Sequence, residues 1–296
     1  MIFEYMRLLK ALLISFTALL TSLPAWADGA GVYPSLWNSH DSGLQEQLDD
    51  ALGRVGLDKA VSDGKLSVAL VDITDLEDPR VATVNGNRMI YAASLPKIAI
   101  LLGAFVKIEE GSMTLDSSTR KSLTSMIRVS SNREATRMLN RVGKERLLGI
   151  LQSDKFDLYD PDVNGGLWVG KEYGKSPAFK RDPLHNLSHG ATAMQTARFY
   201  YLLETGQLVD GKLSDEMKAM LGDPGIKHKF VKGLAGYPDV DIYRKSGSWR
   251  QWHGDSAIVE TGSKKYIVVG LAEDANGGAW LSRMIKPIHE LMVADQ

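Results

Sequence analysis

The segment from Ser94 to Val106, SLPKIAILLGAFV, decides the fold. Ile98 to Val106 is almost wholly apolar, and a run of this length predicts a buried helix, because a membrane span needs about 20 apolar residues. Pro96 is tolerated in a first helical turn, so Ser94 is expected at the N-terminus of this helix, with Lys97 on the same face.

The pair Ser94 and Lys97 is a candidate catalytic unit. A serine hydroxyl is a poor nucleophile by itself, but a partly desolvated lysine amine nearby can take its proton. A helix N-terminus also favours negative charge on the attacking oxygen. Taken alone, the pattern fits equally well an ordinary serine cap followed by a surface lysine.

Strand patterns enclose a helical middle in the rest of the chain. Hydrophobic alternation predicts strands at 66–73, 81–84, 241–245, 255–260 and 265–272. Helical spacing predicts helices at 45–55, 98–106, 117–129, 133–142, 145–151, 193–203, 214–221 and 279–293, the last with a kink at Pro287. Residues 154–190 have no period, and a loop of that length is usually functional or disordered.

This order of elements predicts an α/β (α+β) architecture. The five strands can form one antiparallel sheet, because short connections join the last three as a meander. We expect the first and last helices to cover one face of the sheet. The sheet lobe would comprise residues 28–94 and 222–296, and the helices of residues 95–221 would form an all-helical lobe. An active site is expected at the seam between them.

Composition excludes several classes of function. The 296 residues carry a formal net charge of -1, whereas nucleic-acid binding needs a cationic surplus. The chain has no cysteine, so thiolate catalysis, disulfides and Cys-ligated zinc are excluded. No zinc-protease histidine pattern occurs among the six histidines. We therefore expect no metal and no other cofactor.

The first 27 residues read as a secretory signal peptide. Arg7 and Lys10 precede a short apolar run, and Ala25-Trp26-Ala27 is a small-residue cleavage site. The run is too short to span a bilayer comfortably. We expect cleavage after Ala27, a mature domain of residues 28–296, no stable membrane insertion, and a bacterial periplasmic or secreted monomer. An exported chain without cysteine fits the periplasm.

Two further short motifs carry polar side chains. Ser130-Ser131-Asn132 falls between two predicted helices, where serine and asparagine are also common caps. Lys245-Ser246-Gly247 ends a predicted strand, where it also fits a charged strand end with a turn glycine. Gly247 permits close approach of a ligand to the strand backbone.

In combination, S-x-x-K, S-x-N and K-[ST]-G occur in the order found in serine penicillin-recognising enzymes. The sequence resembles the class A β-lactamases over most of the mature chain, which implies a β-lactamase/transpeptidase-like fold. By this resemblance Ser94 is the acylated nucleophile, Lys97 its proton acceptor, and Ser130 the donor to the leaving nitrogen.

The resemblance also implies substrate-binding roles. Asn132 would hold the substrate amide, while Lys245 and Ser246 would bind its carboxylate. The backbone N–H groups of Ser94 and Ser248 would form the oxyanion hole beside Gly247. Arg250, shortly after this motif, is a further candidate for a substrate carboxylate.

The sequence departs from the family pattern where the acyl-enzyme is cleared. Class A enzymes carry an E-x-x-L-N pattern whose Glu activates the hydrolytic water, and this pattern is absent. Glu172 is the nearest candidate by position, although a solvated loop carboxylate is the alternative. In addition, Ser131 stands where the family has Asp. Only 36 positions separate Ser94 from Ser130, so one wall of the pocket is expected to be missing or rebuilt.

Three functions remain open. The first is β-lactam hydrolysis by an exported serine hydrolase, with slow deacylation. The second is the same acyl-enzyme chemistry on a D-Ala-D-Ala peptide or on another amide or ester. The third is a penicillin-binding sensor without efficient turnover, although a pure binder has no need of Lys97. In each case the partner is a small molecule, either a β-lactam or a peptidoglycan-like amide.

Overall fold

The computed structural model describes residues 33–294. Its helices are α1 (Ser42–Arg54), α2 (Asp58–Ser62), α3 (Lys97–Glu109), α4 (Ser117–Arg128), α5 (Asn132–Val142), α6 (Lys144–Leu151), α7 (Ala193–Glu204), α8 (Gly211–Leu221), α9 (Phe230–Gly233) and α10 (Gly277–Val293). Its strands are β1 (Leu66–Asp72), β2 (Arg80–Val84), β3 (Ile90–Tyr91), β4 (Tyr159–Asp160), β5 (Gly165–Gly166), β6 (Trp168–Val169), β7 (His189–Ala191), β8 (Val240–Trp249), β9 (Trp252–Thr261) and β10 (Lys264–Glu273). The predicted signal peptide lies outside the described residues.

A five-stranded antiparallel sheet organises these residues, with strand order β2-β1-β10-β9-β8. This confirms the predicted sheet and its closing meander. Strand β8 lies at the edge and extends to Trp249, four residues beyond the predicted end, so the Lys245-Ser246-Gly247 motif lies within the strand.

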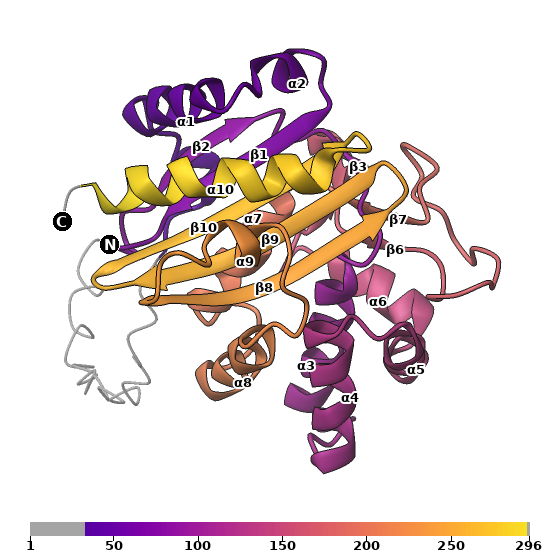
Figure 1. Ribbon diagram of the computed structural model, residues 1–296. Helices are drawn as coiled ribbons and strands as arrows, with labels where there is room; N and C mark the ends of the chain where they lie inside the picture. The colour runs from indigo at the N-terminus through magenta and orange to yellow at the C-terminus, as the bar shows by residue number, and fades with distance from the viewer. Residues whose placement is uncertain (1–32, 295–296) are drawn as a thin grey trace, which may run out of the picture. The chain divides into compact units, whose positions relative to one another are not determined.

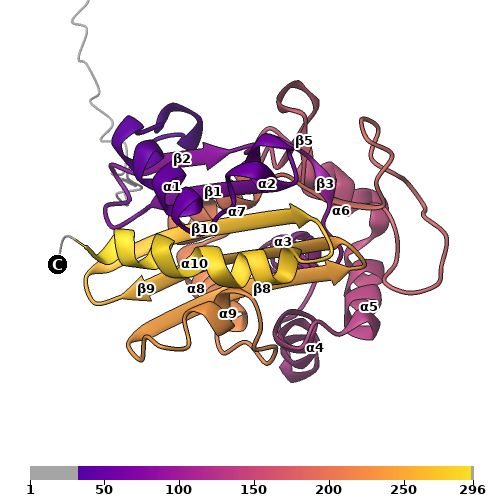
Figure 2. The same cartoon turned by 45° about the horizontal axis from the view of Figure 1, so that its top comes forward.

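Helices cover both faces of the sheet (Figures 1 and 2). Helices α1 and α10 pack on one face, as predicted, over a core that includes Leu48, Val68 and Ile285. Helix α7, from the middle of the chain, packs on the other face against β1 and β10. Its core continues into α3 and α5, so one apolar cluster joins the sheet to the middle helices. The division of the chain into two lobes stays a prediction.

Helix α3 is the centre of the second core. Residues 97–106 are all buried, including the charged Lys97. Because α3 is surrounded on all sides, its sequence is apolar all round rather than amphipathic. Among residues 33–294, no helix is long and apolar enough to cross a membrane.

Residues 154–190 form a long connection that contains only short regular elements of two or three residues. Strands β6 and β7 join β3 in a three-stranded sheet, which carries the segment around Lys171–Tyr173 to the neighbourhood of Ser94. The buried carboxylate of Asp182 fixes the loop by accepting hydrogen bonds from the Tyr159 hydroxyl and from the N–H groups of Leu184 and Leu187. Strands of two or three residues are too short to give a period, so the sequence pattern does not reveal them.

Candidate active site

Ser94 lies in the turn between β3 and α3. The chain reverses at Ala93, which has a positive φ of 52°, a conformation that costs a residue with a Cβ of order 1 kcal/mol or more. Helix α3 begins at Lys97, after Pro96, so Ser94 lies in the turn just before the helix N-terminus. Backbone hydrogen bonds between residues three positions apart, such as Lys97 N–H to Ser94 O at 3.3 Å, connect this turn to the helix.

Lys97 is buried beneath this turn with its amine at the site. Its Nζ donates to Ser130 O at 2.7 Å, to Ser130 Oγ at 3.2 Å and to Asn132 Oδ1 at 2.8 Å. Burial lowers the pKa of Lys97 from 10.5 to about 7. Near neutral pH an appreciable fraction of this amine is therefore uncharged and able to accept a proton.

Ser130 joins Lys97 to the end of the sheet. The residue takes a positive φ of 57° in the connection between α4 and α5. From β8, the Nζ of Lys245 donates to Ser130 Oγ at 3.0 Å and to Ser246 O at 2.7 Å. Burial and the nearby charge of Lys97 hold the pKa of Lys245 well below its usual value. One hydroxyl thus lies between two buried amines, an arrangement that can pass a proton.

Gly247 brings the edge strand against the nucleophile turn. A Cβ at this position would lie 2.2 Å from Ala92 O and 2.8 Å from Ser94 N. The sequence predicts that a ligand can approach the backbone at Gly247 closely. In the structure, the backbone of Ala92 and Ser94 makes this close approach. On the opposite side of the strand, the buried Lys229 donates to Gly247 O at 2.5 Å and to Gly254 O at 2.8 Å. These contacts fix the end of β8 beside Ser94.

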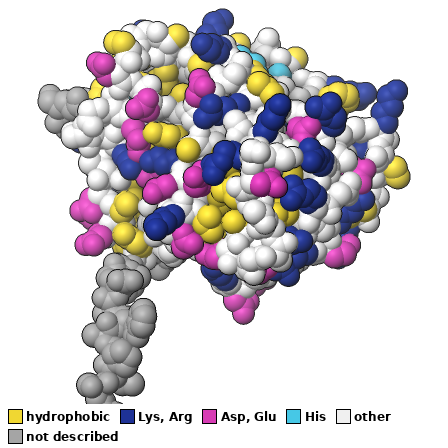
Figure 3. All heavy atoms as spheres, turned by 90° about the horizontal axis from the view of Figure 1, so that it is seen from below, with side chains coloured by type: hydrophobic (Ala, Val, Ile, Leu, Met, Phe, Trp, Pro, Cys, Tyr) yellow, Lys and Arg dark blue, Asp and Glu magenta, His cyan; other side chains and the backbone are white. Residues whose placement is uncertain are grey.

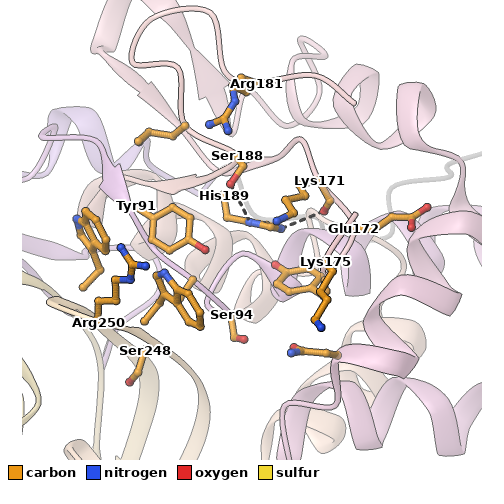
Figure 4. Close-up of a pocket in the computed structure, with 17 residues that line it drawn as sticks. Tyr91, Ser94, Lys171, Glu172, Lys175, Arg181, Ser188, His189, Ser248 and Arg250 are labelled. Carbon is orange, nitrogen blue, oxygen red and sulfur yellow. Dashed lines mark hydrogen bonds between the residues drawn. The ribbon is translucent and has the colours of Figure 1, made fainter. Parts of the chain in front are cut away.

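A cavity of about 610 Å³ opens at Ser94 (Figure 4). Five of the sequence-predicted residues line it: Ser94, Asn132, Glu172, Ser248 and Arg250. The other five do not line the cavity: Lys97, Ser130, Lys245, Ser246 and Gly247. The contacts described above place them beside it. The structure thus brings all three motifs together.

Glu172 lies at the cavity but is engaged elsewhere. Its carboxylate forms an ion pair with Lys144 Nζ at 2.6 Å and accepts a hydrogen bond from Ser176 Oγ at 3.1 Å. The hydrogen bond from Lys144 is the main cause that lowers the pKa of Glu172. Figure 4 shows the side chain directed away from Ser94. A carboxylate already paired with a lysine is a weak base, and this one faces the helices.

Tyr173 forms the wall of the cavity above Lys97, and no sequence motif marks this residue. The lysine Nζ lies 4.5 Å from the centre of the tyrosine ring. The ring centre of His189 lies 4.4 Å from that of Tyr173, and burial lowers the pKa of His189 to about 4. The Tyr173 hydroxyl is buried without a hydrogen-bond partner among the described residues. Aromatic and uncharged groups therefore border the lysine on this side.

The outer rim of the cavity is aromatic and basic. Tyr91 and Trp252 meet edge to face with ring centres 5.4 Å apart, and the exposed Arg250 guanidinium lies 5.7 Å from the Trp249 ring. Lys175 and Arg181 line the cavity from the 154–190 loop, and no motif had marked them. Their positions depend on the path of that loop, which has no periodic pattern.

The comparisons with known proteins agree with this geometry. The model of the β-lactamase enzyme family matches residues 47–125 and 117–288. No curated protein matches the chain. Among solved structures, a β-lactamase from Sphaerobacter thermophilus is 15% identical, with a TM-score of 0.66 over 84% of this chain and 97% of that one.

Two other similar structures are PBP-A and a variant of the class A β-lactamase of the last common ancestor of Gram-negative bacteria. PBP-A is 15% identical, with a TM-score of 0.63 over 88% of this chain and 98% of that one. The ancestral variant is 17% identical, with a TM-score of 0.62 over 83% of this chain and 97% of that one. These likenesses establish the β-lactamase/transpeptidase-like fold. By its match over most of its length, the chain belongs to the β-lactamase enzyme family, and it is a β-lactamase-like serine hydrolase.

Proposed function

We propose that this protein is an exported serine hydrolase that forms an acyl-enzyme at Ser94 with β-lactams and releases the product slowly. The observation that carries the proposal is the Ser130 hydroxyl, held between the amines of Lys97 and Lys245 at 3.2 and 3.0 Å beside Ser94. A lysine buried without a carboxylate partner costs stability, which a proton-transfer role accounts for.

Acylation uses the residues of the three motifs. Neutral Lys97 takes the proton of the Ser94 hydroxyl while the serine oxygen bonds to the substrate carbonyl carbon. The N–H groups of Ser94 and Ser248 stabilise the resulting oxyanion. When the carbon–nitrogen bond breaks, Ser130 gives its proton to the leaving nitrogen and regains one from protonated Lys97. The substrate carboxylate binds at Lys245 and Ser246, and Asn132 holds the side-chain amide.

Deacylation lacks a comparable group. Hydrolysis needs a base within about 3 Å of a water that attacks the ester carbonyl. Glu172 is paired with Lys144 and directed away, and the ring of Tyr173 lies beside Lys97. Loss of a general base typically costs ~10²–10⁴-fold in rate. The acyl-enzyme should therefore accumulate.

This same observation favours a second candidate, a D-Ala-D-Ala peptidase or another amide or ester hydrolase that β-lactams inhibit. A variant of the similar protein PBP-A has been solved as an acyl-enzyme complex with penicillin G. A penicillin-binding sensor would use the same acylation and omit turnover. A D-Ala-D-Ala peptide and a penicillin, supplied in parallel, separate these functions by which of them is turned over.

The test is time-resolved mass spectrometry of the protein with a penicillin. We expect rapid gain of one penicillin mass, a burst of product equal to the enzyme present, and slow loss of the adduct. Ser94→Ala should remove the adduct, whereas Ser188→Ala, which changes another serine of the same cavity, should retain it. An undiminished adduct on Ser94→Ala would overturn the proposal.

Export is proposed on the sequence of residues 1–27. Material recovered from the periplasm of the expressing bacterium should have an intact mass that begins at Asp28. A mass that still includes residues 1–27 would contradict cleavage.

A further inference from the structure

The cavity at Ser94 carries an excess of positive charge that the catalytic steps do not use. Four basic side chains line it: Lys171, Lys175, Arg181 and Arg250. Glu172 is the one carboxylate among the lining residues in the described part of the chain, and Lys144 neutralises it. None of the four basic side chains forms an ion pair with a carboxylate of residues 33–294.

Other basic side chains on the surface are in part paired with carboxylates. Figure 3 views the lower end of the molecule, where α4, α5 and α8 lie, and basic side chains are also frequent there. Three of those cations are paired, because Arg120 lies against Glu216, and Arg133 and Arg137 both lie against Glu134. Unmatched cations that surround a concave site raise the local concentration of anions.

These cations come from opposite sides of the opening. Figure 4 shows Arg250 on the β8–β9 turn at one side, Lys171 and Lys175 on the loop at the other, and Arg181 beyond Ser188. The aromatic rings of Tyr91 and Trp252 also line the cavity. A ligand with a flat or apolar body and a negative charge fits this arrangement.

The cavity extends to one side of the reacting bond. It is lined by Asn132 and Ser248 but not by Ser130 or Lys245. Under the proposed function, the leaving nitrogen and its carboxylate face Ser130 and Lys245. The cavity therefore receives the other half of the substrate, which is the acyl side chain.

We propose that this cavity is an anion-selecting subsite, and that the preferred acyl donors carry a carboxylate on the acyl side chain in addition to the one near the leaving nitrogen. This inference rests on the proposed function for the direction in which the substrate binds. Each exposed cation contributes about two- to fivefold, the range of exposed ion pairs, and screening by salt reduces the contribution.

Three penicillins that differ in one α-substituent test this. Benzylpenicillin has hydrogen there, ampicillin an ammonium group and carbenicillin a carboxylate, while the ring system and its own carboxylate are the same. We expect the second-order rate constant of acylation to follow the order carbenicillin, benzylpenicillin, ampicillin. The ratio of the first to the last should be about tenfold at low ionic strength and should shrink in 0.5 M salt.

Charge-removing variants locate the effect. The double variant Lys175→Gln, Arg250→Gln should lower the carbenicillin-to-ampicillin ratio several-fold. The matched control Arg283→Gln, Lys286→Gln also removes two positive charges, from the exposed side of α10 away from the cavity, and should leave the ratio unchanged. Equal rates for the three penicillins, or a ratio that the double variant does not alter, would overturn the subsite.

A second measurement separates this inference from the proposed function. If none of the three penicillins forms an ester with Ser94, the proposed function is wrong. Non-covalent binding to Ser94→Ala protein, followed through the fluorescence of Trp249 and Trp252, then decides the subsite alone. Tighter binding of carbenicillin than of ampicillin supports it, and equal dissociation constants reject it.

Discussion

The uncharged state of Lys97 gives the most direct test of the proposed acylation. Burial lowers the pKa of this amine from 10.5 to about 7. At pH 7 about half of the amine is then neutral, compared with about 1 in 3,000 at its ordinary pKa. The shift corresponds to about 5 kcal/mol of preference for the neutral form in the folded protein. A base of this strength needs no further activation at neutral pH.

The sign of the pH dependence follows from this lowered pKa. Neutral Lys97 is the active form, so the acylation rate at saturating substrate should rise with pH and level off above about 7. At pH 6 the rate should be about one tenth of its plateau. Lys97→Arg keeps a positive charge but cannot lose its proton, so it should abolish the pH step and slow acylation ~10²–10⁴-fold.

Stopped-flow acylation with a chromogenic cephalosporin between pH 5.5 and 8.5 measures this. Saturating substrate is required because deprotonation of Lys245 weakens binding of the substrate carboxylate as pH rises, which would oppose the expected trend. The pKa of His189 is about 4, so this neighbour stays neutral throughout the range. A flat profile, together with an unimpaired Lys97→Arg protein, would refute Lys97 as the base.

Three shorter predictions follow from contacts around the site. In Gly247→Ala the new Cβ would lie 2.2 Å from Ala92 O and should displace the end of β8 from the turn that holds Ser94. Acylation should therefore slow at least tenfold, as measured by kinetics on the folded variant. Arg244→Met should lower the free energy of unfolding by about 3–5 kcal/mol in urea titrations, because it leaves Asp255 buried without its ion-pair partner. Glu172→Gln should change deacylation less than about twofold by mass spectrometry, because that carboxylate already pairs with Lys144, and a trapped adduct would identify it as the base.

Long elements of the fold could be predicted from the sequence because their patterns are long. The strand at 66–72 and the helix at 117–128 were expected within about one residue of their observed ends. The order of these elements also gave the antiparallel sheet. The ends of β8 and β9 were missed, since Lys245 to Trp249 alternates no apolar residues and its pairing depends on the partner strand.

The catalytic motifs could be predicted because each is a short local pattern, and their combined order carries the information. That the three motifs lie close together in space was inferred from the family resemblance. The hydrogen bonds from Lys97 and Lys245 to Ser130 now show it for these three residues. The cavity wall could not be predicted in the same way. Tyr173 and Arg181 reach the site through a loop held by the single buried carboxylate of Asp182, and no periodicity marks such a contact.

Tyr173 links the two halves of the proposed reaction. A carboxylate near Lys97 would raise the pKa of that lysine by its charge and would also be available to activate a water. An aromatic ring 4.5 Å from the amine carries no negative charge to raise the lysine pKa as a carboxylate would, and it offers no base. Ready acylation and slow deacylation would then share one structural cause. On this reasoning a single wall of the cavity, rather than the three motifs, decides whether the acyl-enzyme is an intermediate or the end of the reaction.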